Sequence, residues 1–64
     1  MLHNIEYNYY MKAVTRGGAS YHIGNAASFN TAYQFAETYW FDANVEKVLI
    51  IRISDNEVVD SYPC

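Results

Sequence analysis

Residues 28–53 read SFNTAYQFAETYWFDANVEKVLIIRI, and this stretch decides the fold because it contains two hydrophobic periods in succession. In its first half, apolar side chains recur at helical spacing and cover an arc of about 160° at 100° per residue. Ala32 and Ala36 on that arc are small enough to let a helix lie close to a sheet. In its second half, the run Val48–Ile53 is mostly β-branched and apolar at both parities, as is typical of a central strand.

The ends of the helix are indicated by single residues. Ser28 is a plausible N-cap, because its hydroxyl can accept a hydrogen bond from a free amide of the first turn. The helix is predicted from Phe29 to about Phe41. Phe41 falls off the apolar arc, so the helix ends there or this ring is exposed. The stretch 42–44 is the predicted exit loop.

Two short strands precede the helix. Residues 5–15 alternate in polarity and predict a strand, and a second alternation follows Gly17 and Gly18. A two-residue glycine loop would place the apolar face of one strand opposite the polar face of the next. A three-residue loop, Gly17–Ala19, instead pairs Ala13 with Ile23. We therefore expect the longer loop or a bulge, with a glycine in the left-handed region.

A second hairpin follows the helix. Residues 45–54 form the predicted strand, and residues 57–62 return as the last one. A two-residue turn at Asp55–Asn56 would pair Ile53 with Val58. The complete order is ββαββ, which predicts an α+β fold with an antiparallel sheet and one helix packed on one face. Residues 1–64 are expected to form a single domain, and the sequence leaves the strand order open.

One helix can cover only one face of this sheet, so the alternation predicts a covered face and an open one. The predicted covered face contains Tyr7, Tyr9, Met11, Ala13, Tyr21, Ile23, Leu49, Ile51, Ile53, Val58 and Tyr62. The predicted partner interface on the open face contains Tyr10, Val14, Arg16, His22, Val48, Ile50, Arg52 and Val59, with Lys12 and Ser61 beside them. An apolar and aromatic patch rimmed by cations is typical of an interaction surface. The alternatives are a face that is merely tolerated in water and a face used for self-association as a homodimer.

Composition restricts the partner. The chain has net charge −3 and only four scattered Lys and Arg residues, which argues against direct nucleic-acid binding and is compatible with a basic partner. Seven tyrosines suit a protein with much of its surface in contact with another molecule. With one cysteine, Cys64, no intrachain disulfide can form, and no apolar run is long enough to span a membrane. A cytoplasmic location is expected.

No catalytic or metal-binding pattern is recognisable, so we expect no enzyme, no cofactor and no metal. His3 and His22 have no second ligand at metal-binding spacing. Ser20, His22 and Asp60 include the residue types of a catalytic triad without supporting spacing. Cys64 is expected to be a free thiol at the end of the chain.

An amphipathic helix with Ala at four-residue spacing, a β-branched strand and flanking hairpins together resemble the small α+β proteins of bacteriophages and mobile elements, which include several anti-CRISPR proteins. The resemblance implies a stoichiometric inhibitor that docks on a CRISPR effector complex in the host cytoplasm. This chain is much less acidic than DNA-mimicking inhibitors, which implies steric blocking. The alternative function is a homo-oligomeric structural or regulatory protein that uses the open face on itself, and the mass in solution distinguishes the two.

Overall fold

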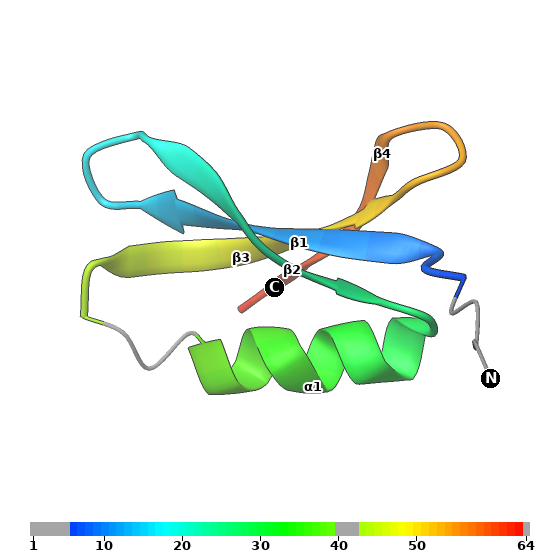
Figure 1. Cartoon of the computed structure of the whole chain (residues 1–64). Coiled ribbons are helices and arrows are strands. Elements are labelled where there is room, and N and C mark those ends of the chain that lie inside the picture. The colour runs from blue at the N-terminus through cyan, green and yellow to red at the C-terminus, as the bar shows by residue number, and fades with distance from the viewer. Residues whose placement is uncertain (1–5, 40–42, 64) are drawn as a thin grey trace, which may run out of the picture.

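The computed structural model describes residues 6–39 and 43–63. Its elements are β1 (Tyr9–Thr15), β2 (Ser20–Ala26), α1 (Phe29–Tyr39), β3 (Val45–Arg52) and β4 (Glu57–Tyr62). The four strands form one antiparallel sheet in the order β2-β1-β3-β4. Figure 1 shows α1 lying along one side of a strongly twisted sheet, with no described element on the other side. The predicted ββαββ fold with one helix on one face is confirmed.

Helix α1 begins where the sequence predicts. The Thr31 amide donates to Ser28 Oγ at 3.2 Å, and the Ala32 amide donates to the Ser28 carbonyl at 3.1 Å, so Ser28 is the N-cap. Ala32 and Ala36 are fully buried against the sheet. The predicted helix end at Phe41 and the start of the exit loop lie outside the described residues.

The core lies between α1 and the two central strands. Met11 is opposite Ile50 and Ala13 is opposite Val48, and all four side chains have no exposed surface. Because directly opposed residues share a face, Val48 and Ile50 belong to the face that α1 covers. The sequence-based placement of these two residues on the open face was wrong. Leu49, predicted to be covered, points the other way, opposite Lys12.

The first hairpin has the predicted three-residue loop, shifted by one position. Its loop residues are Arg16–Gly18, and Ala13 is opposite Tyr21 instead of Ile23. Gly18 has φ 93°, so a left-handed glycine is present as predicted. Ile23 is skipped in the pairing, because Met11 is opposite Gly24 while Lys12 is opposite His22. This bulge lets Ile23 pack against the core on the α1 side.

The second hairpin departs further from the prediction. Four residues, 53–56, connect Arg52 to its partner Glu57, and Asn56 adopts φ 60°. The predicted two-residue turn is therefore wrong. Val59 is skipped in the pairing of β4 with β3 and packs against the core, whereas Val58 is opposite Ile51 on the far face. The predicted faces of Val58 and Val59 are thus reversed by a single bulge.

Candidate functional site

The candidate site is the side of the sheet that α1 does not cover, which we call the open face. Strand register places three rows of side chains there. The rows are Asn25–Tyr10–Ile51–Val58, His22–Lys12–Leu49–Ser61 and Ser20–Val14–Lys47. Apolar, aromatic and basic side chains are therefore mixed on one surface, and none of these eleven residues is acidic.

A line of polar contacts crosses the first two rows of the open face. His22 Nε2 lies 2.6 Å from Asn25 Oδ1, and the His22 ring is 5.8 Å from the Tyr10 ring, centroid to centroid. The Tyr10 hydroxyl donates to Asn56 Oδ1 in the β3–β4 turn. The Tyr10 side chain therefore extends across β3 over its opposite neighbour, Ile51. This explains why Ile51 is only 4% exposed although no helix covers it.

Three residues of the predicted interface are on the open face. Tyr10 and Val14 are half-buried there, and His22 is exposed. Their binding role stays a prediction, but their shared surface is a feature of the structure.

Three other predicted interface residues are not on the open face. Val48 and Ile50 have no exposed surface and belong to the core, so they cannot contact a partner of the folded chain. Val59 is half-buried against that core. The sequence misled because residues 48–51 are apolar at both parities, so alternation could not decide which side faces the helix.

The two predicted arginines also lie apart from the open-face rows. Arg16 is in the β1–β2 loop, and its Nε donates to the Ala43 carbonyl at 3.0 Å. Arg52 is opposite Tyr9, on the α1 side of the sheet. Its Nη2 lies 2.7 Å from Asp55 Oδ2 and 2.9 Å from Glu57 Oε1.

The contacts among Arg52, Asp55 and Glu57, which we call the Arg52 cluster, shift the pKa values of Arg52 and Asp55. The hydrogen bond to Asp55, and then the charge of that carboxylate, raise the pKa of Arg52. Hydrogen bonding from the guanidinium in turn lowers the pKa of Asp55. The cluster is exposed, and its arginine is already bound to two carboxylates. It is therefore a brace for the β3–β4 turn and offers little attraction to an anionic ligand.

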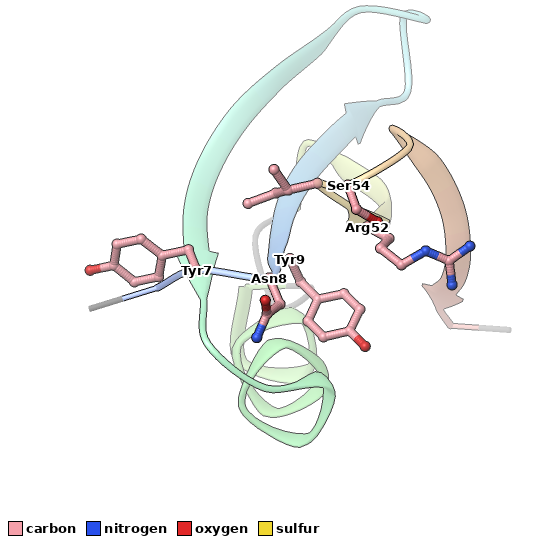
Figure 2. Close-up of a pocket in the computed structure, with 6 residues that line it drawn as sticks. Tyr7, Asn8, Tyr9, Arg52 and Ser54 are labelled. Atoms are coloured by element: carbon pink, nitrogen blue, oxygen red, sulfur yellow. The ribbon is translucent and has the colours of Figure 1, made fainter. Parts of the chain in front are cut away.

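A hollow of about 350 Å³ lies beside this brace, where the chain enters β1 and leaves β3. It is lined by Tyr7, Asn8, Tyr9, Arg52, Ile53 and Ser54. Figure 2 shows that the Tyr7 ring points away from Tyr9 and Arg52, so the polar groups of the lining do not converge on one point. A ligand site normally has convergent polar groups, so this hollow is a weaker candidate than the open face.

A smaller hollow of about 180 Å³ lies on α1, lined by Phe35, Thr38 and Tyr39. The Phe35 and Tyr39 rings are stacked, with centroids 6.0 Å apart and an interplanar angle of 14°. Phe35 remains 37% exposed.

Sequence reasoning missed several members of the open face. Leu49, Ile51 and Val58 were assigned to the covered face, and Lys47 and Asn25 were assigned to neither. Pairing β3 directly with β1 would have placed Lys47 on the open face, because Val14 and Lys47 are opposite one another. The strand order, which the sequence left open, was the missing information.

Within residues 6–39 and 43–63, no group of three or more His, Cys, Asp or Glu side chains is arranged to hold a metal ion. The predictions about His3 and Cys64 fall on residues outside the described part. In the described part of the chain, no helix is long and apolar enough to cross a membrane. Comparison with protein-family models, with curated proteins and with solved structures gives no match.

Proposed function

We propose that this chain is a protein-binding inhibitor that acts without turnover and docks through its open face. The finer proposal is that its partner is a CRISPR effector complex and that it works sterically in the cytoplasm of the host cell, as an anti-CRISPR protein. The observation that supports docking is the uncovered sheet surface itself. It carries Tyr10, Val14 and Leu49 half-buried, and Val58 at 51% exposure. Apolar and aromatic groups gathered in this way are typical of interaction surfaces.

The edges of the sheet are less suited to binding than its face. β2 and β4 are the edge strands, and each carries a bulge, at Ile23 and at Val59. Bulges interrupt the regular row of backbone groups that a second strand would need for pairing. This favours docking through side chains on the face over addition of a strand from another molecule.

The test is a titration of the purified chain into guide-loaded CRISPR effector complexes of several types, with cleavage of a matched target DNA as the readout. We expect one effector type to lose activity at equimolar amounts of the chain. An enzyme would instead inhibit at amounts far below equimolar and increasingly with time. If every effector cleaves normally in excess chain, the finer proposal is wrong.

A matched pair of variants tests the surface in the same assay. Tyr10→Ala removes the aromatic ring that crosses the open face, whereas Tyr21→Ala removes one from the α1 side, where Tyr21 is 41% exposed. We expect only Tyr10→Ala to weaken inhibition, with circular dichroism confirming that both variants are folded. Equal inhibition by the two variants would show that the Tyr10 side of the sheet is not needed for inhibition. A free chain that is a dimer at all concentrations, by light scattering, would support self-association instead.

A further inference from the structure

The rows of the open face differ in charge from the chain as a whole. The three rows of the open face contain Lys12 and Lys47 and no carboxylate, although the chain as a whole has net charge −3. Exposed Glu46 lies beside Lys47 at a bulge, because Val14 is opposite Lys47 while Thr15 is opposite Val45, and it belongs to none of the rows. On β4, Asp60 is opposite Ile50 and Glu57 is opposite Arg52, which places both acidic residues on the α1 side. Net charge alone suggested a basic partner, but the three rows themselves carry only positive charges.

Neither Lys12 nor Lys47 is in an ion pair with another residue of the described part. Arg52 makes two ion pairs, with Asp55 and with Glu57. Lys12 lies between His22 and Leu49 in its row, whereas Lys47 is opposite Val14 and follows Glu46. Both charges are available to a partner, next to apolar surface that a partner can cover.

We propose that the open face binds an acidic protein surface, one that presents Asp or Glu side chains beside apolar ones. This deepens the proposed function, and it rests on that function in taking the partner to be a protein. Carboxylates would pair with Lys12 and Lys47, while apolar side chains would cover Leu49 and Val58. If the partner is a CRISPR effector, this chain contacts it away from its basic nucleic-acid channel.

The observations favour a protein over a nucleic acid. Nucleic-acid affinity depends on the number of phosphates that cations neutralise, and the three rows carry two lysines. Base binding also needs free aromatic platforms. The one tyrosine of the rows, Tyr10, is tilted against His22 and tied to Asn56.

A second copy of this chain fits the open face poorly. A two-fold dimer brings the same patch of both copies together. Lys12 is in a central strand and a central row, so a two-fold axis through the middle of the face would bring the Lys12 ammonium groups of both copies close together. Like charges placed opposite one another weaken an interface, so a self-complementary dimer through this face is disfavoured.

The test uses two synthetic peptides of equal length with the same Leu and Phe positions, one with Asp and Glu between them and one with Lys. Each is titrated into the isotope-labelled full chain, and amide signals are followed by NMR. We expect the acidic peptide to shift signals of residues around Lys12 and Leu49, and the basic peptide to bind there at least about threefold more weakly. Equal binding of both peptides, no binding of the acidic one, or shifts confined to α1 would overturn the proposal.

Two double variants with the same net charge locate the effect. Lys12→Gln with Lys47→Gln removes the charges of the open face, whereas Asn30→Asp with Gln34→Glu adds two negative charges on exposed positions of α1. We expect the first to weaken acidic-peptide binding by about three- to tenfold and the second to leave it nearly unchanged. Equal losses would show that only net charge matters, which contradicts a local site.

Salt and DNA complete the test. Raising salt from about 0.15 M to about 1 M shortens the Debye length from ~8 to ~3 Å, so acidic-peptide binding should weaken in the wild type but little in the lysine variant. Tighter binding of a single-stranded oligonucleotide at the same face would refute a protein partner. The outcome is separable from that of the proposed function. Effector inhibition that survives Lys12→Gln with Lys47→Gln would retain the function and reject the charge recognition.

Discussion

Val48→Thr and Val58→Thr form a matched test of which side of the sheet is buried. Val48 has no exposed surface and sits under α1, whereas Val58 is 51% exposed on the open face. Threonine has nearly the shape of valine, so the change replaces a methyl group with a hydroxyl group and creates no cavity. Sequence alternation placed Val48 on the open face and Val58 on the covered face, which is the reverse of the structure. The prediction from alternation and the structure therefore give opposite expected results.

The magnitudes follow from burial. A hydroxyl group at position 48 is removed from water on folding. A buried hydroxyl without a hydrogen-bond partner lowers the free energy of unfolding by about 1–3 kcal/mol. At the exposed position 58 we expect a change within about 0.5 kcal/mol. A chain of 64 residues has a free energy of unfolding of about 3–10 kcal/mol, so Val48→Thr removes a large part of it. A cost near 2 kcal/mol corresponds to a decrease in Tm of about 8–16 °C for a protein of this size.

The assay is equilibrium urea unfolding of wild type and both variants, followed by far-UV circular dichroism and tyrosine fluorescence. The slope m should be unchanged, so that shifts of the midpoint report stability alone. A larger loss for Val58→Thr than for Val48→Thr would refute the register of β3 and β4, and with it the composition of the open face. Equal small losses would show that the hydroxyl introduced at position 48 finds a hydrogen-bond partner or water.

Three further predictions concern local features. Ser28→Ala should lower the free energy of unfolding by about 1 kcal/mol because the N-cap of α1 is lost, and an unchanged urea midpoint would contradict that cap. Gly18→Ala places a side chain at φ 93° and should lower the free energy of unfolding by about 1–2 kcal/mol. Gly17 is not at positive φ, and an added Cβ there has no atom nearer than 4.0 Å, so Gly17→Ala should not destabilise the fold. Equal changes in Tm for the two variants would contradict this. The pKa of Asp55 is lowered by folding, so its contribution to stability is present above the unfolded pKa of about 3.9 and is lost as pH falls through the lower folded pKa. Asp55→Asn should therefore flatten the decline of stability below about pH 4 in urea unfolding at a series of pH values, and an unaltered decline would contradict the bond to Arg52.

Local signals predicted the elements of the fold well because each element has its own chemistry. The helix is specified by its apolar arc, its Ser28 cap and its two alanines, and all three are found in α1. The hairpin at Gly17–Gly18 follows from the need for a residue at positive φ, which Gly18 supplies. Each of these requirements is met within a few residues, so no tertiary information was needed.

The faces of the second hairpin could not be predicted in the same way. Residues 48–51 are apolar at every position, so either parity could be buried. The bulge at Val59 then shifts register by one residue, and such a slip exchanges the faces on either side of it. The strand order also matters, because Val48 and Ile50 are fixed by lying opposite Ala13 and Met11 on β1. These are contacts between distant parts of the chain, which alternation within one strand does not encode.

The burial of Ile51 has a consequence for how the open face can bind. Its 4% exposure comes from sheet neighbours, with Tyr10 held across it by the bond to Asn56. The centre of the face is thus already packed and needs no partner for its stability. A partner would meet a preformed surface, so little conformational entropy would be lost on docking. The affinity must then come from the accessible groups around Ile51, namely the Tyr10 ring, the apolar surface of Leu49 and Val58, and the charges of Lys12 and Lys47. For this reason the lysine and tyrosine variants, and not core substitutions, are the decisive tests of function.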